Sequence, residues 1–104
     1  MARVVWTESA LGDLESIVRY VARDSRTYAE RLGTRIVSAP RRLEQFPLSG
    51  RVVPEFHDES IRELIYASYR ILYLVKEDLC YVLAVIHASR DIVRHIRPGE
   101  WIIE

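Results

Sequence analysis

One histidine and three arginines in the second half of the chain have the side chains that acid–base chemistry on an anion requires. Arg62 and Arg70 stand in two runs expected to form strands, and His87 ends a third run, with Arg90 just beyond it. A histidine moves a proton near neutral pH, and arginine stabilises developing negative charge, as an RNA-cleaving site needs. If the three strands are adjacent, these side chains could converge at one end of the sheet.

The same residues also have a purely structural explanation. Arg62 would pair with Glu63 or Glu59. Arg70 would pair with a carboxylate in a loop, and His87 would only end its strand. The sequence leaves both explanations open.

Other kinds of site find little support. His57, His87 and His95 lack the spacing of a zinc site, and Cys80 has no cysteine partner. The four glycines are scattered, so they form no phosphate-binding loop, and no serine lies in a nucleophile-elbow motif. We therefore expect neither a metal ion nor a cofactor.

Composition and charge restrict the class of protein. The 104 residues are 49% hydrophobic and 29% charged, which is typical of one soluble globular domain over residues 1–104. Fifteen basic residues, all but Lys76 arginine, balance fifteen acidic ones, which argues against direct nucleic-acid binding by bulk charge. A single cysteine and the lack of a span of ~20 apolar residues favour a cytoplasmic protein that does not enter membranes.

The first half of the chain is expected to form a strand and two helices. Arg3–Trp6 is a short β-type run, and Thr7 can cap a helix whose apolar residues recur at helical spacing up to Val21. Thr27 and Glu30 predict a capping box for the second helix. Its apolar stripe is Ala29, Leu32, Ile36, Ala39, Leu43 and Phe46. Pro40 lies inside this stripe and should kink the helix, which Phe46-Pro47 ends.

The second half is expected to form an antiparallel meander. Pro47–Ser60 contains glycine, proline and polar residues, and is predicted to be a connecting loop. Ile61–Tyr66, Tyr69–Val75 and Tyr81–Ala88 are rich in β-branched and aromatic residues and are predicted strands. The fold class is therefore α+β, with an antiparallel two-helix hairpin packed on an antiparallel β-sheet in the order β-α-α-β-β-β.

The last two strands offer apolar side chains to both faces of the sheet. The helix hairpin covers one face, so the other needs a cover from the tail, residues 90–104, or from a partner protein. In that tail, a short helix can start at Ser89 or Asp91 and run to Ile96. The apolar segment Trp101–Ile103 should dock on this chain or on another.

These motifs, in this order, resemble the RelE/ParE superfamily of toxins. Trp6-Thr7, followed by Ala10, Asp13-Leu14, Ile17 and Tyr20, is similar to the first helix of that superfamily. Four later segments resemble its ParE branch at similar spacing: Phe46–Glu55, Arg62–Leu64, Tyr69–Tyr73 and Val85–Asp91. The resemblance runs from about Val4 to Asp91 and implies a strand, a helix hairpin and an antiparallel sheet.

The resemblance also implies a function. Such a protein would be the toxin of a type II toxin–antitoxin module, neutralised by a protein antitoxin that wraps around it and could cover the second apolar face. RelE-like members cut messenger RNA on the ribosome with basic residues and an acid–base histidine or tyrosine. ParE-like members inhibit DNA gyrase and have no established catalytic site.

Three features favour the gyrase-inhibiting branch. The chain is neutral, Arg51 is the only basic residue in Gly50–Ser60 where the nucleases carry lysines, and no tyrosine follows Tyr81. We therefore expect no catalytic residues, a ParD-like ribbon–helix–helix antitoxin as partner and DNA gyrase as target. The alternative is a ribosome-dependent endoribonuclease that uses Arg70, His87 and Arg90. The residues expected to contact a partner are Arg62, Arg70, Tyr73, His87, Arg90 and Trp101.

Overall fold

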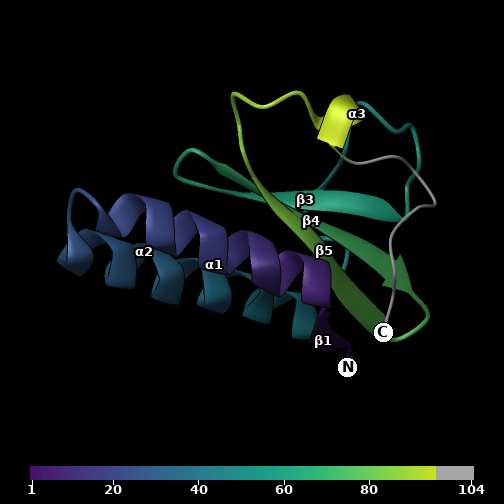
Figure 1. The fold of residues 1–104 in the computed structure, drawn as a ribbon. Helices are drawn as coiled ribbons and strands as arrows, with labels where there is room; N and C mark the ends of the chain where they lie inside the picture. Colours follow the sequence, from purple (N-terminus) through teal and green to yellow (C-terminus); the bar gives the residue numbers. More distant parts are fainter. Residues whose placement is uncertain (96–104) are drawn as a thin grey trace.

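A helix hairpin lies across one side of a five-stranded sheet (Figure 1). The computed structural model describes residues 1–95. The predicted α+β fold is confirmed, and its elements follow in this order: β1 (Arg3–Trp6), α1 (Glu8–Ala22), α2 (Arg26–Ser38), the 3₁₀ helix η1 (Ala39–Glu44), β2 (Arg51–Val52), β3 (Ile61–Tyr66), β4 (Tyr69–Lys76), β5 (Leu79–His87) and α3 (Ile92–His95).

Hydroxyl side chains start both long helices. As predicted, Thr7 caps α1: its Oγ1 accepts a hydrogen bond from the N–H of Ala10 at 3.2 Å, and donates one to the carbonyl of Val82 in β5. The cap of α2 is Ser25, whose Oγ accepts from the N–H of Tyr28 at 3.1 Å. The predicted capping box at Thr27 is therefore wrong, because the helix begins two residues earlier.

Pro40 changes the type of helix instead of kinking it. α2 ends at Ser38, and Pro40 lies near the start of η1. Proline has no N–H to donate to the carbonyl four residues back, so the α-helical ladder cannot continue there. Pro40 and Leu43 are buried on one side of η1, whereas Phe46, which was expected to continue the apolar stripe, is 62% exposed.

The strand order is β1-β5-β4-β3-β2. The antiparallel meander of β3, β4 and β5 is confirmed, but the sheet is mixed, because β1 pairs in parallel with β5. β2 was expected to be part of a loop. Its two residues pair with Arg62 and Glu63 and form an edge of the sheet.

The sheet carries an apolar core on each of its faces. On the helix side, which faces α1 and α2, the core includes Leu64, Ile71, Tyr73, Val82 and Val85. On the far side it includes Ile61, Leu72, Leu83, Ala84 and Ile86. Val53 and Phe56 from the segment before β3, and Ile92 of α3, pack on the far side and supply part of the cover that it needs.

A β-bulge in β5 changes which side chains share a face. Near the turn Lys76 pairs with Leu79 and Tyr73 with Val82, but Leu72 pairs with Ala84, so Leu83 is an extra residue. Just beyond the bulge, the N–H of Val85 donates a hydrogen bond to a carboxylate oxygen of Asp13 in α1, at 3.0 Å. The helix hairpin is thereby tied to the irregular part of the strand.

The short helix predicted near the end of the chain is present as α3. An Oδ1 atom of Asp91 accepts from the N–H of Val93 at 3.1 Å, which supports Asp91 as the helix start. Ile96 and the apolar segment Trp101–Ile103 lie outside the described residues. Within residues 1–95, no helix has the length and apolar character to cross a bilayer.

Candidate functional site

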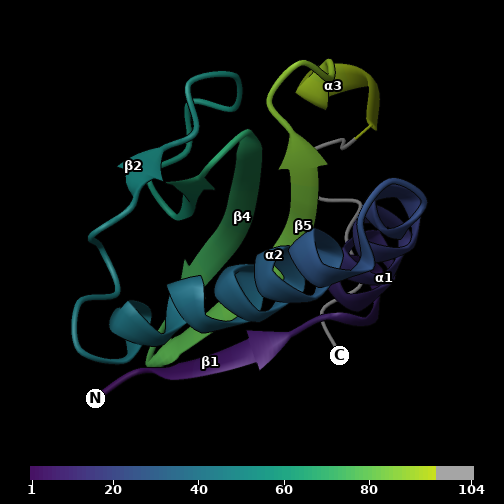
Figure 2. The ribbon, with the colours of Figure 1, turned by 90° about the vertical axis from the view of Figure 1, so that its left-hand side faces the viewer.

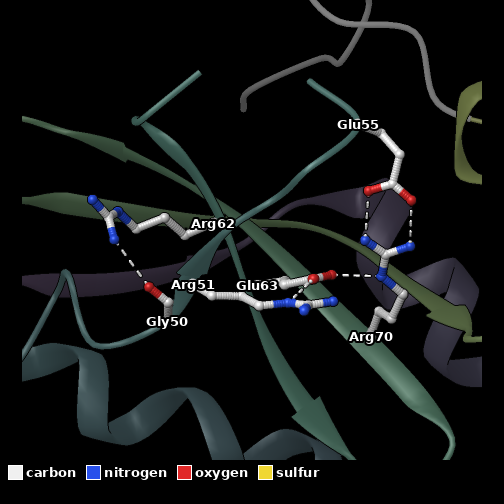
Figure 3. A network of polar contacts seen from close by, with 6 residues as sticks. All are labelled: Gly50, Arg51, Glu55, Arg62, Glu63 and Arg70. Atoms are coloured by element: carbon white, nitrogen blue, oxygen red, sulfur yellow. Dashed lines mark hydrogen bonds and ion pairs between the residues drawn. The ribbon is translucent and has the colours of Figure 1, made fainter. Parts of the chain in front are cut away.

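Glu63 and Arg70 form the centre of a polar network on the far side of the sheet (Figure 3). Glu63 of β3 lies opposite Leu72 of β4, so Arg70, two residues before Leu72, is its diagonal neighbour on the same face. The Arg70 Nε donates to the Glu63 carboxylate at 2.5 Å. Each of these two apolar strands thus contains a buried charge, and the two charges form an ion pair with each other.

Two further residues complete the network. The Arg70 guanidinium donates through both terminal nitrogens to Glu55, each at 2.9 Å, and the Arg51 Nε donates to the second oxygen of Glu63 at 2.6 Å. The Glu63 side chain is fully buried, Arg70 is 9% exposed and Glu55 is 32% exposed. Two cations and two anions therefore balance around a buried centre, as a buried charge requires, whereas Arg51 itself is 61% exposed.

The proximity of opposite charges fixes the protonation state of the network. The hydrogen bonds from Arg70 lower the pKa of the Glu55 carboxyl from 4.5 to about 2. The hydrogen bonds from Glu55 and Glu63 raise the pKa of the Arg70 guanidinium. Arg70 therefore stays cationic and stays occupied by internal carboxylates, which is unlike an arginine held ready for a substrate anion.

Arg62 and Tyr73, on the helix side of the sheet, hold residues 47–50 just before β2 by hydrogen bonds. The Arg62 guanidinium donates to three backbone carbonyls, those of Leu48, Gly50 and Glu59, at 3.0–3.3 Å. The Tyr73 hydroxyl donates to the Pro47 carbonyl and accepts from the Gly50 N–H, both at 2.9 Å. Tyr73 is completely buried, so it has a structural position and presents no surface to a partner.

His87 lies on the helix side and is exposed. Its Nδ1 accepts a hydrogen bond from the Ser89 N–H at 3.1 Å and lies 2.7 Å from the Ser89 hydroxyl oxygen. Its ring and the Tyr69 ring are nearly perpendicular, with the centroids 5.3 Å apart. Arg90 follows in the same exposed turn, where its N–H donates to the His87 carbonyl at 2.9 Å.

The structure does not bring the predicted cluster together. Tyr69 pairs with His87, and Arg70 is the next residue along β4, so Arg70 and His87 point to opposite faces of the sheet. Arg62 shares the helix side with His87, but it pairs with Tyr73, four residues from Tyr69 and hence about 13 Å further along the strand. Only His87 and Arg90 remain neighbours.

The β-bulge in β5 determines the face on which His87 lies. With a regular two-residue turn at Glu77-Asp78, Arg70 would pair with Val85, and His87 would lie on the Arg70 face. The extra Leu83 shifts the pairing by one residue and turns His87 to the helix side. The structural explanation of Arg70, pairing with a loop carboxylate, is confirmed, because Glu55 is that carboxylate.

The other predictions about the site have different outcomes. Of the expected partner contacts, His87 and Arg90 are exposed and Arg62 is half-buried, whereas Arg70 and Tyr73 are buried. Trp101 lies outside the described residues. Among residues 1–95, no three side chains of the metal-binding types gather closely enough to hold an ion.

Comparison with known proteins identifies the family. Residues 4–92 match the family described as ParE toxin of the type II toxin–antitoxin system parDE. The chain belongs to this ParE toxin family. It is therefore a toxin of the type II toxin–antitoxin class, and an antitoxin is its expected partner.

Individual relatives carry names from both branches of the superfamily. Toxin RelE2 of Caulobacter vibrioides is 35% identical over 91 residues, which are 86% of this chain and 99% of that protein. Putative toxin Y4kP of Sinorhizobium fredii is 36% identical over 86% of this chain and 91% of that protein. The solved chromosomal ParDE system from P. aeruginosa has the same fold, with a TM-score of 0.68 and 23% identity over 84% of this chain and 96% of that chain.

The network around Glu63 was not foreseen in this ParE-family toxin. Its signal was present in the sequence, since Glu63 and Arg70 are the charges that alternation places among buried apolar residues of β3 and β4. A lone buried charge requires a partner of opposite sign. The sequence alone does not predict the diagonal register that brings the two residues together, or the position of Glu55 beside Arg70.

Proposed function

We propose that this ParE-family toxin inhibits DNA gyrase by binding it as a protein ligand, and that a ParD-like antitoxin of the ribbon–helix–helix class neutralises it. The observation that supports the proposal is the separation of Arg70 from His87 on opposite faces of the sheet. A ribonuclease of the alternative kind needs its acid–base histidine and its arginines around one phosphate. Inhibition by binding has no such requirement.

The electrostatic state of Arg70 supports the same proposal. Glu55 and Glu63 take up its donors, so the guanidinium is not directed at an external anion. His87 is exposed at the end of β5, and its Nδ1 accepts a hydrogen bond from the N–H of Ser89 in the following turn. With its nearest aromatic contact at Tyr69, it lacks the enclosed, desolvated surroundings that make an acid–base group effective.

An antitoxin would find apolar surface on the hairpin and after η1. Leu11, Tyr20, Tyr28, Phe46 and Leu48 are between 49% and 69% exposed, which is a large exposure for side chains of this size. We expect the antitoxin complex to bury more than ~1,600 Å² in total, because a wrapping segment must offset its ordering entropy. A gyrase inhibitor would act in the cytoplasm, where its target works.

Paired assays test the proposed target. Purified toxin is added to a gyrase supercoiling reaction and, separately, to ribosomes programmed with a messenger RNA. We expect wild-type toxin to inhibit supercoiling and to leave the messenger uncut. His87→Asn should retain that inhibition, because no proton transfer is involved in binding a protein target.

The matched control is His57→Asn, at an exposed histidine in the segment before β3, where the backbone φ of 52° suits asparagine. Cleavage by the wild type that His87→Asn slows by about 10²–10⁴-fold, with His57→Asn unaffected, would establish the ribonuclease alternative instead. The presence of a small ribbon–helix–helix protein encoded beside the toxin gene would test the antitoxin class.

A further inference from the structure

Four exposed arginines lie along α2 and η1, a strip of the chain that we call the arginine face: Arg31, Arg35, Arg41 and Arg42. Ala29, Leu32 and Ile36 bury the opposite side of α2, and this places Arg31 and Arg35 on its outer side, about 6 Å apart along the axis. Figure 2 shows α2 running across the front of the sheet.

The 3₁₀ helix continues the strip. Pro40 and Leu43 are three residues apart and both buried, which is one full turn of η1. Arg41 and Arg42 lie between them and are exposed. The four guanidinium groups are thus carried by rigid, well-anchored helices and not by a loop.

The arginine face is charged although the whole chain is neutral. Residues 26–44 contain five arginines and only two acidic residues, Glu30 and Glu44, whereas the rest of the chain has ten basic and thirteen acidic residues. A net charge of zero therefore hides a separation of charge along the chain. The neutrality of the whole chain therefore does not exclude an anionic partner at this surface.

None of the four arginines is neutralised by an ion pair within residues 1–95. Arg51 and Arg70, in contrast, are both compensated by buried or half-buried carboxylates. Arg19, which is also exposed, is paired with Glu15, so within residues 1–95 the four arginines differ from it in being exposed without a carboxylate partner.

The residues around these arginines indicate what kind of anion fits. Thr27, Thr34 and Ser38 lie on α2 near Arg31 and Arg35, and all three are exposed. The hydroxyls of Thr34 and Ser38 donate to backbone carbonyls of the same helix, so the guanidinium groups are the main donors of this surface. Protein interfaces have an apolar core, which this strip of hydroxyl and guanidinium groups does not provide. Arginine side chains contact phosphates in protein–nucleic acid complexes, and the arginine fork matches phosphate geometry.

We propose that the arginine face binds the phosphate backbone of duplex DNA, without regard to base sequence. A single strand is held by several stacking aromatics in a groove, whereas this surface is the outside of a helix with one tyrosine, Tyr28, near its start. The choice of DNA over RNA rests on the proposed gyrase target, which works on duplex DNA. The contact would place the toxin beside the DNA that its target holds.

The test measures binding of the full-length toxin to a fluorescein-labelled 20-base-pair duplex of mixed sequence, by fluorescence anisotropy. If three to four phosphates are contacted, affinity should fall roughly 40- to 150-fold between 50 and 200 mM salt. Arg31→Gln/Arg35→Gln should weaken binding at 50 mM salt by at least tenfold and lower the salt slope by about two. The control is Arg3→Gln/Arg94→Gln, which removes the same charge at two exposed sites outside the arginine face.

Several results would overturn the proposal. These are no binding by the wild type at 50 mM salt, equal losses in the two double variants, or tighter binding of a poly-glutamate peptide than of the duplex. Tighter binding of double-stranded RNA or single-stranded DNA of the same length would overturn the choice of duplex DNA. Because no gyrase is present, failure here is distinct from failure of the supercoiling assay, which can be run on the same variants.

Discussion

Replacing Glu63 by glutamine should destabilise the protein by about 2–3 kcal/mol, because a buried carboxylate then loses one of its two charged contacts. Glu63 accepts from Arg70 at 2.5 Å on one oxygen and from Arg51 at 2.6 Å on the other. The amide group of glutamine would set a donor against one of these donors. A hydrogen bond to a charged group contributes about 1.5–3 kcal/mol, and no water reaches the fully buried side chain to replace it.

Glu55→Gln should cost less, about 1 kcal/mol, although its carboxylate makes two bonds to Arg70. The Glu55 side chain is 32% exposed, so water can substitute for part of the lost interaction. In Glu63→Gln, Arg70 keeps Glu55, which holds the cost below the 3–5 kcal/mol of a buried pair that is broken completely. Because both carboxylates share Arg70, the double variant should cost more than the sum of the two single variants.

Urea unfolding followed by circular dichroism at pH 7 and 25 °C measures these differences. The control is Glu59→Gln, an exposed carboxylate in the segment before β3, which should change stability by less than about 0.5 kcal/mol. If Glu63→Gln costs no more than Glu55→Gln or than the control, burial does not determine the strength of the network, and the reasoning above is wrong.

Three further predictions use the same unfolding assay. The pKa of Glu55 is lowered from 4.5 to about 2, so its ionised form stabilises the fold by about 1–2 kcal/mol after solvent screening. This stabilisation is complete above about pH 4.5 and is lost as the pH falls towards 2. The wild type should therefore lose more stability over that range than Glu55→Gln, and equal losses would contradict this. Gly12→Ala should raise the free energy of unfolding by about 0.5–1 kcal/mol, because Gly12 is in a helix and a Cβ there meets nothing within 4 Å. Gly50→Ala should lower it by about 1–3 kcal/mol, because its Cβ would lie 2.6 Å from the Glu63 carbonyl oxygen. The reverse order would show that these contacts do not determine the effect. Tyr73→Phe should cost about 1–3 kcal/mol by leaving the buried Gly50 N–H and the partly buried Pro47 carbonyl without the hydroxyl. A neutral result would mean that water replaces the hydroxyl.

The sequence predicted most of the helices and strands, because their signals are local. The apolar spacing of α1 and α2, and the β-branched and aromatic runs of β3 to β5, are read within a few residues of each other. The features that were missed depend on distant segments. β1 pairs in parallel with β5, some 76 residues away, and two-residue β2 exists only because β3 lies beside it.

The candidate site was predicted less well, and the reason is one residue in β5. Arg70 and His87 would share a face if the pairing continued unbroken from the two-residue turn at Glu77-Asp78. The extra Leu83 reverses the face of everything beyond it, and no local pattern in the sequence marks its position. The structural role of Arg70 was open to inference, since a lone charge in a buried strand needs a partner.

The parallel pairing of β1 with β5 has a consequence for how the toxin folds during its synthesis on the ribosome. Val4 meets Cys80, so the sheet cannot include its first strand until β5 has been synthesised and has left the exit tunnel. The helix hairpin has mostly local contacts and can form earlier, with Leu32 and Ile36 still lacking the sheet that buries them. Nearly the whole chain through His87 must therefore be made before any native toxin exists, and until then the nascent chain exposes an apolar helical surface.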